Sequence, residues 1–325
     1  MLNPRLKLNK NLFEEKVEQI PIRKGFGEGL VKAAELDLRV VGLCADLTES
    51  TQMYLFKEKF PQRFIELGVA EQNMAGVASG LAAMGKIPFI SSYAVFSPGR
   101  NWEQIRTTIC YNNQKVVIAG SHAGVSVGPD GGSHQAIEDI AITRVLPRMV
   151  VISPCDALEA KRATLAAAAT DTPVYLRLAR EKTPVITTED TPLKIGKAEV
   201  YWEVESPKAG IIATGALLYQ ALLAAKELEN VEVMNLSTIK PFDEKGVFEF
   251  AKRCGKIVTV EEHQIAGGMG SAVAEFLAKE YPVPMEFIGV HDQFGESGTP
   301  EELIKHFGMD KDSIIKAIKI VLKRS

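Results

Sequence analysis

One carboxylate stands where a short apolar run meets a segment of small residues. Glu71 follows residues 63–67, which predict a buried strand, and precedes residues 75–84, in which glycine, alanine and serine predominate. Two glycines inside a helix would each cost about 1 kcal/mol relative to alanine, so we expect close packing on a neighbouring backbone. Taken alone, Glu71 is best explained as a cap for first-turn amides. The rest of the chain decides between that role and a catalytic one.

Two histidines and a carboxylate lie in the glycine-rich loop that follows a predicted strand at 116–120. They are His122, Asp130 and His134. Ligands of open α/β sheets bind beyond the carboxyl ends of the strands, which makes this loop a candidate substrate site. A solvated loop with unrelated histidines is the alternative. The histidines are twelve positions apart without a further ligand cluster, so no metal site is predicted.

Polar or aromatic residues also follow three other predicted strands. Because the carboxyl ends of parallel strands share one edge of a sheet, we expect these residues to converge on one rim. An aromatic pair there can wall a flat heterocycle, although a core contact is its usual meaning. The strand-end residues are Asp46, Ser50, Tyr93, Phe96 and Arg180.

Two further motifs carry weaker signals. Residues 124–128 match the G-x-S-x-G pattern of a serine hydrolase, whose nucleophile needs a sharp strand-to-helix turn. Here Pro129 and Asp130 follow instead of a helix, which argues against that enzyme class. The glycines at 267–270 precede a predicted helix and fit either an anion site or a tightly packed turn.

Composition excludes several classes of protein. The chain has 325 residues, 46% of them hydrophobic and 24% charged, with a formal net charge of -3. This balance, without a basic stripe, argues against nucleic-acid binding. Four isolated cysteines and the absence of a secretory segment favour a reducing cytoplasm, and no apolar run is long enough for a membrane span.

Short apolar runs alternate with helical patterns along the chain, which predicts an α/β fold with parallel, doubly wound sheets. A polar, proline-punctuated stretch at 181–197 predicts the boundary between two domains. We assign residues 1–190 to the first domain, including a surface-lying arm at 1–20, and residues 191–325 to a smaller second domain. The expected strands lie at 40–45, 64–67, 87–93, 116–120, 149–153 and 174–178, then at 209–214, 231–236, 256–260 and 285–289.

The segments around Glu71, Phe96 and residues 122–135 resemble the C-terminal half of transketolase, which comprises the pyrimidine-binding and C-terminal domains. The resemblance extends over nearly all of the chain after residue 20. It implies that Glu71 contacts the aminopyrimidine of thiamine diphosphate and activates it. Tyr93 and Phe96 would pack on that ring, and Asp46 would lie near it. Gly99 stands where the family usually has a further aromatic residue.

The resemblance also implies a site for sugar phosphates. Four residues match positions that bind the phosphate group, a chemically suitable set of guanidinium, hydroxyl and imidazole donors. Asp130 and His134 match positions that contact substrate hydroxyls, and His134 would take part in catalysis. The four phosphate positions are Arg23, Ser50, His122 and Arg180.

Transketolases hold the diphosphate and Mg²⁺ with an N-terminal Gly-Asp-Gly element, which this sequence lacks. We therefore expect one subunit of a split enzyme, completed by a separate N-terminal subunit in a heterotetramer. It would transfer a two-carbon ketol unit between phosphorylated sugars. Three alternatives remain open: a deoxyxylulose phosphate synthase-like enzyme, a 2-oxoacid dehydrogenase β subunit, and a catalytically silent assembly subunit of the same fold.

Overall fold

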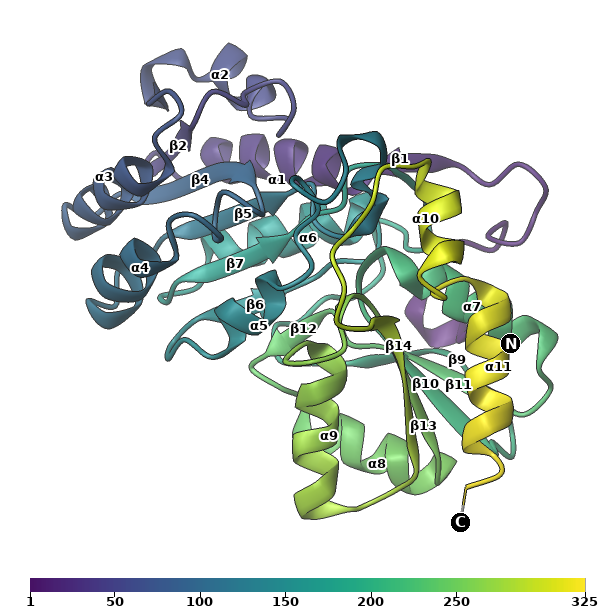
Figure 1. Ribbon diagram of the computed structural model, residues 1–325. Helices are drawn as coiled ribbons and strands as arrows, with labels where there is room; N and C mark the ends of the chain where they lie inside the picture. Colours follow the sequence, from purple (N-terminus) through teal and green to yellow (C-terminus); the bar gives the residue numbers. More distant parts are fainter. Residues whose placement is uncertain (325) are drawn as a thin grey trace.

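The computed structural model describes residues 1–324, which form two α/β units built on separate sheets (Figure 1). The first sheet has seven strands in the order β12-β6-β7-β5-β4-β2-β3, and the second has five in the order β14-β13-β10-β11-β9. All pairings in the first sheet are parallel except that of β12 with β6, and in the second all except that of β11 with β9. The predicted fold class is confirmed.

The strands of the first sheet are short and apolar because helices cover both of its faces. In β2, for instance, Val40 and Cys44 pack on one face, while Val41 and Leu43 pack on the other. The strands are β2 (Val40–Cys44), β3 (Phe64–Glu66), β4 (Ile87–Tyr93), β5 (Val117–Ser121), β6 (Val150–Ile152), β7 (Val174–Arg177) and β12 (Thr238–Lys240).

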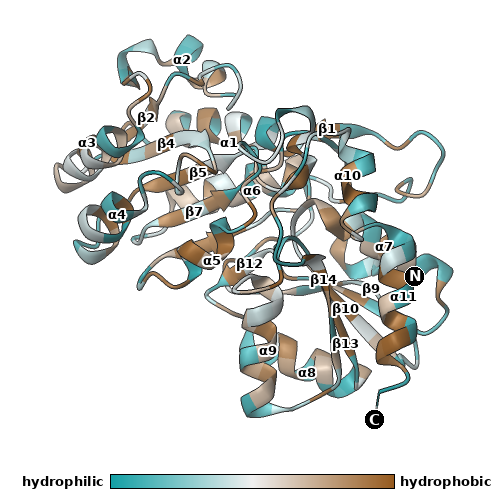
Figure 2. Ribbon diagram, viewed as in Figure 1, coloured by the Kyte–Doolittle hydropathy of each residue, from teal (hydrophilic) through white to brown (hydrophobic). Residues whose placement is uncertain are grey.

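One face of this sheet packs against α1 (Ile22–Leu36), α2 (Tyr54–Lys59) and α6 (Ala157–Ala168). The other face packs against α3 (Glu71–Ala83), α5 (Asp139–Arg144) and a segment at 102–111. That segment begins as α4 (Trp102–Gln104) and continues as the π-helix η3 (Ile105–Tyr111). Asp156 caps α6 by accepting from the Glu159 amide at 2.7 Å. The hydrophobic residues gather on the strands and on the helix sides that face them (Figure 2).

The second sheet repeats this plan on a smaller scale. Its strands are β9 (Glu199–Trp202), β10 (Ala209–Ala213), β11 (Val231–Asn235), β13 (Ile257–Gln264) and β14 (Met285–Val290). Its helices are α7 (Leu218–Glu227), α8 (Glu244–Cys254), α9 (Met269–Glu280), α10 (Pro300–His306) and α11 (Lys311–Val321). Within residues 1–324, no helix combines the length and apolar character needed to cross a membrane.

Two segments cross between the halves of the molecule. The N-terminal arm is not surface-lying as predicted, because Leu6, Leu8 and Leu12 are buried in the hydrophobic core of the second unit. Strand β12 belongs to the second half of the sequence but pairs with β6 of the first sheet. Neither contact leaves a periodic signal in the sequence, because each depends on a distant surface. The two units are therefore joined by shared packing as well as by the linker.

Within residues 1–324, the glycines of α3 do not pack on a neighbouring element. A Cβ atom placed on Gly76 or on Gly80 would meet no atom within 4 Å. By contrast, a Cβ on Gly25 of α1 would lie 1.8 Å from the carbonyl oxygen of Ala157. Close packing within the chain thus explains the glycine of α1 and not those of α3.

Candidate active site

Glu71 is the first residue of α3, and its side chain is only 2% exposed. Its carboxylate accepts a hydrogen bond at 2.7 Å from Nη1 of Arg100, whose side chain is 47% exposed. The buried side-chain amide of Asn101 donates to the backbone carbonyl of Glu71 at 3.1 Å. In the described part of the chain, no first-turn amide of α3 donates to this carboxylate. Glu71 therefore faces a planar cation and does not cap its own helix.

A row of rings lies beside this carboxylate. The imidazole of His122 stacks on Tyr93 with ring centroids 3.8 Å apart, and Tyr93 stacks on Phe96 at 5.9 Å. The guanidinium of Arg100 lies over Phe96, with Cζ 4.6 Å from the ring centroid. The ring of His134 makes T-shaped contacts with those of Phe96 and Tyr93, with ring centroids 5.6 Å and 6.0 Å apart. The row runs without interruption from the end of β5 to Glu71.

Gly99 has a steric reason to differ from the aromatic residue expected at its position. A Cβ atom there would lie 2.1 Å from the carbonyl oxygen of Val95, which is backbone and cannot give way easily. The Gly99 amide also donates to the Ala94 carbonyl at 3.1 Å, which holds the turn closed. This tight turn excludes a third ring and brings Arg100 over Phe96.

Two guanidinium groups converge next to the ring row. Nε of Arg23 donates to the carbonyl oxygen of Arg180 at 3.1 Å, and a terminal nitrogen of Arg23 donates to the carbonyl of Ser50. Nη1 of Arg180 donates to the carbonyl of Val127 at 2.6 Å and lies 3.1 Å from a Glu181 carboxylate oxygen. Burial, together with repulsion by Arg180, lowers the pKa of Arg23. An anion between these groups would relieve that repulsion.

His122 connects the ring row to the guanidinium pair. Burial lowers its pKa to about 3, and the nearby Arg23, Arg180 and His134 add to the effect. Its Nδ1 lies within hydrogen-bond distance, 2.9 Å, of the Ser121 hydroxyl oxygen. The imidazole is thus neutral at physiological pH and can accept or donate a hydrogen bond without adding charge.

The loop that carries His134 is fixed from the second unit. Nε2 of Gln135 donates to the carbonyl oxygens of Val125 and Glu296, at 3.0 Å and 2.8 Å. The backbone amide of Ser126, in the 3₁₀ segment η4 (Val125–Asp130), donates to the buried Glu262 carboxylate at 2.5 Å. Ser126 is therefore held in a 3₁₀ turn and does not form the strand-to-helix elbow of a serine hydrolase.

Of the ten predicted site residues, two are exposed and make no side-chain hydrogen bond or ion pair with this assembly within residues 1–324. Asp46 is exposed at the end of β2, in a left-handed conformation with φ of 58°. Its backbone amide, and not its carboxylate, is bound by Glu66 at 2.8 Å. Asp130 is exposed at the end of η4. The other eight converge, namely Arg23, Ser50, Glu71, Tyr93, Phe96, His122, His134 and Arg180.

Sequence reasoning missed Arg100 and Asn101. Arg100 lies four residues after Phe96 in a segment of turns, where its amide donates to the Phe96 carbonyl at 3.0 Å. The turn at Gly99 that directs it was not visible in the sequence.

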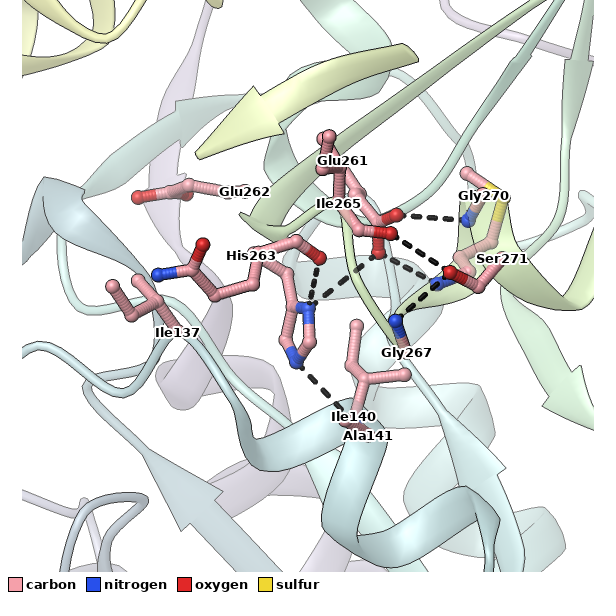
Figure 3. Close-up of polar contacts among 12 residues, drawn as sticks. Ile137, Ile140, Ala141, Glu261, Glu262, His263, Ile265, Gly267, Gly270 and Ser271 are labelled. Carbon is pink, nitrogen blue, oxygen red and sulfur yellow. Dashed lines mark hydrogen bonds and ion pairs between the residues drawn. The ribbon is translucent and has the colours of Figure 1, made fainter. Parts of the chain in front are cut away.

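The glycine-rich segment at 267–270 is occupied by a side chain of the protein itself (Figure 3). The carboxylate of Glu261 accepts from the amides of Met269 and Gly270 at 2.6 Å and 2.8 Å. Gly270 itself packs closely on Thr259. The sequence left two interpretations open, an anion site or a packed turn. The packed turn is correct, because the N-terminus of α9 already binds the carboxylate of Glu261.

Both halves of the chain match known family models. Residues 18–185 match the transketolase pyrimidine binding domain, and residues 196–314 match the transketolase C-terminal domain. The chain belongs to the transketolase family. The expected resemblance is thereby confirmed for both domains.

Several transketolase relatives cover the same length of sequence as this chain. A Methanocaldococcus jannaschii protein, provisionally named a transketolase C-terminal section, is 43% identical over 93% of this chain and 96% of its own length. The 6-deoxy-6-sulfo-D-fructose transketolase subunit SqwH of Clostridium sp. is 39% identical over 96% and 98%. A structure titled as the inactive β4 tetramer of a split-gene transketolase superposes with a TM-score of 0.87 at 42% identity, covering 93% of this chain and 98% of that one. This chain corresponds to the C-terminal subunit of split transketolases.

Proposed function

We propose that this chain is the C-terminal subunit of a thiamine diphosphate-dependent transketolase that transfers a two-carbon ketol unit from a ketose phosphate to an aldose phosphate. The observation that carries the proposal is the stack of Tyr93 on His122 at 3.8 Å. This stack links two neighbouring sites. Glu71 and Phe96 form a binding site for a flat heterocycle, which we call the pyrimidine seat, and the arginine pair forms a cationic cluster suited to phosphate. A ketol transferase needs both seats side by side, because cofactor and sugar phosphate react with each other.

The residues at Glu71 fit the aminopyrimidine of the cofactor. The guanidinium of Arg100 resembles the aminopyrimidine in its contacts, because it is planar, donates an N–H group to Glu71 and lies over the face of Phe96. An aminopyrimidine has the same flat shape and can meet the same carboxylate and ring. We infer that Glu71, Phe96 and Tyr93 hold it, with Glu71 sharing a proton with ring nitrogen N1′.

Bound thiamine diphosphate supplies the nucleophilic thiazolium carbon that makes and breaks the sugar's carbon–carbon bond. The protein's part is to position groups. Glu71 holds the proton at N1′, and the cluster of Arg23, Ser50, His122 and Arg180 binds the phosphate. His134 makes T-shaped contacts with the aromatic rings, where a substrate hydroxyl can donate to it or accept from it. Asp130 would reach the substrate only if its exposed carboxylate turned inward.

The diphosphate and Mg²⁺ require ligands from a partner. Across residues 1–324, no three histidine, cysteine, aspartate or glutamate side chains are grouped so that they could hold a metal ion. The chain also spans only 49% of the rat transketolase, to which it is 36% identical. We propose that a separate N-terminal subunit supplies both sites in a cytoplasmic heterotetramer with two copies of each chain.

The test is an assay of the chain co-expressed with its N-terminal partner, with and without thiamine diphosphate and Mg²⁺. The substrate panel covers ketose and aldose phosphates and includes sulfofructose and apulose phosphate, because relatives are named for these sugars. We expect cofactor-dependent ketol transfer with at least one phosphorylated donor. Oxidation of pyruvate without any transfer would instead indicate a 2-oxoacid dehydrogenase. Micromolar cofactor binding by the isolated chain would contradict its dependence on a partner.

A further inference from the structure

Arg100 occupies the two contacts that define the proposed pyrimidine seat. Its Nη1 lies 2.7 Å from Oε2 of Glu71, and its Cζ lies 4.6 Å from the centroid of Phe96. Tyr93 stacks nearly parallel to Phe96, with 14° between the ring planes. A flat ligand that stacks on Phe96 and binds Glu71 must therefore displace the guanidinium of Arg100.

The guanidinium and the aminopyrimidine present the same chemistry to these residues. Both are planar, both donate N–H groups in their own plane, and both have a π-face that stacks on an aromatic ring. Arg100 binds Oε2 of Glu71 and covers Phe96, so an aminopyrimidine that uses the same oxygen and the same ring competes with it.

Arg100 can leave the seat without disturbing the chain around it. Its side chain is 47% exposed, whereas that of Glu71 is 2% exposed. The backbone is held independently, because the Nδ2 of buried Asn101 donates to the Glu71 carbonyl and the Ser97 hydroxyl, each at 3.1 Å. Rotation of the Arg100 side chain into solvent exchanges one ion pair for hydration and leaves these contacts in place.

We propose that Arg100 is an internal competitor for the aminopyrimidine seat and thereby sets the affinity of the subunit for its cofactor. The proposal rests on the assignment of Glu71 as the pyrimidine-binding carboxylate. Arg100 lowers the affinity by the free energy needed to break its pair with Glu71. Assembly with the partner supplies the diphosphate contacts that overcome this competition.

Thiamine, which lacks the diphosphate, isolates the pyrimidine half of the interaction. We would titrate it into the full-length isolated chain by ligand-observed NMR, using wild type, Arg100→Ala, Arg100→Gln, Arg100→Lys and Arg106→Ala. Arg106 is an exposed arginine six residues further along and serves as the matched control. The same variants, assembled with the partner, would be titrated with thiamine diphosphate by calorimetry.

Arg100→Ala and Arg100→Gln should bind thiamine about tenfold more tightly than wild type, and Arg106→Ala should match wild type. Arg100→Lys should fall between, because its ammonium keeps the charge and loses the planar stack. The dissociation constant for thiamine diphosphate in the assembled enzyme should shift in the same order. If thiamine binding is below detection in every isolated chain, the titration of the assembled enzyme with thiamine diphosphate tests the proposal instead.

Equal or weaker binding by Arg100→Ala would overturn the proposal and make Arg100 a residue that positions Glu71. The double variant Glu71→Ala/Arg100→Ala separates this failure from failure of the proposed function. Loss of binding in the double variant supports Glu71 as the seat, whatever Arg100 does. Tight binding by the double variant would mean that the pyrimidine lies elsewhere, and both inferences would fall.

Discussion

Strands in both sheets carry polar groups at their carboxyl ends, but the two units use them differently. Beside the first sheet, Arg23 of α1 and Arg180, which follows β7, are only partly buried, and Arg180 pairs with the Glu181 carboxylate. In the second sheet, β13 carries Glu261, Glu262 and His263 just before its last residue, Gln264, and all three are buried. At the first edge Arg23 and Arg180 keep their charges available, whereas Glu261, Glu262 and His263 of β13 use theirs internally.

The partners of the β13 residues show what the second edge does. Nε2 of His263 accepts from the Ala141 amide of α5 at 3.3 Å (Figure 3). A terminal nitrogen of Arg177 donates to the Glu262 carbonyl at 2.8 Å. These contacts join the two units. Polar strand ends thus indicate a binding site only where the fold leaves them accessible.

Replacement of Glu71 should have the largest effect on the accessible edge. Glu71→Ala removes the proton-sharing carboxylate, and we expect at least a hundredfold slower deuterium exchange of the thiazolium C2 proton in the assembled enzyme. Circular dichroism and subunit association should be almost unchanged, because Asn101 contacts only the backbone of Glu71. Near-normal exchange would reduce Glu71 to a structural residue.

Breaking the buried ion pair between β7 and α5 of the first unit should instead cost stability. Nε of Arg177 donates to Asp139 at 2.8 Å, and the Tyr175 hydroxyl donates to the same carboxylate oxygen at 2.6 Å. Asp139→Ala leaves a buried guanidinium unpaired, so the unfolding free energy should fall by about 3 to 5 kcal/mol in urea titrations. Removal of an exposed partner, as in Glu28→Ala, should change it far less. If both variants lost a similar amount of unfolding free energy, the distinction between buried and exposed ion pairs would be contradicted.

The buried edge should also respond to pH. Burial raises the pKa of Glu261 from 4.5 to about 7, so its stabilising contribution is complete below pH 4.5 and disappears as the pH rises toward 7. Burial lowers the pKa of His263 from 6.5 to about 4, which gives the opposite slope between pH 4 and 6.5. The two slopes largely cancel in the wild type.

Glu261→Gln should remove one of these slopes. The unfolding free energy of Glu261→Gln minus that of the wild type should increase by about 1 to 3 kcal/mol as the pH rises from 4.5 to 7. The exposed Glu301→Gln should show a constant difference over the same range. A constant difference for Glu261→Gln would mean that the α9 amides keep this carboxylate ionised throughout.

A smaller effect should appear when the cationic cluster is weakened. Arg180→Ala removes charge-assisted hydrogen bonds worth about 1.5 to 3 kcal/mol, so the KM for phosphorylated sugars should rise by about tenfold or more. The KM for hydroxypyruvate, which has no phosphate, should change much less. Steady-state kinetics on both donors checks this. Equal losses would make Arg180 a structural residue like those of the buried edge.

The smallest effect concerns α3 beside the accessible edge. Gly76→Ala should stabilise the isolated chain by about 0.5 to 1 kcal/mol, because its Cβ meets no atom within 4 Å. Gly25→Ala should destabilise it, because that Cβ would clash with the Ala157 carbonyl. Urea denaturation compares the two. We predict that α3 contacts another subunit, in which case Gly76→Ala should also weaken association in analytical ultracentrifugation.

The sequence determined the regular elements of this protein. Residues 40–45, 87–93 and 174–178 were predicted as strands, and the structure has them at Val40–Cys44, Ile87–Tyr93 and Val174–Arg177. Buried strands and amphipathic helices have local patterns that a single chain reveals. The same patterns predicted that residues after the strands share one edge, because parallel strands bring their carboxyl ends together, whereas Arg23 was assigned only by the resemblance to transketolase.

Only the tertiary structure decided how each polar group is used. Leu6, Leu8 and Leu12 pack in the core of the second unit, and β12 pairs with the first sheet. Each segment is complementary to a surface formed by residues distant from it in the sequence. The glycines at 267–270 enclose Glu261, and the turn at Gly99 turns Arg100 onto Phe96. Such contacts depend on the distance between side chains from separate elements, and no local pattern encodes that distance.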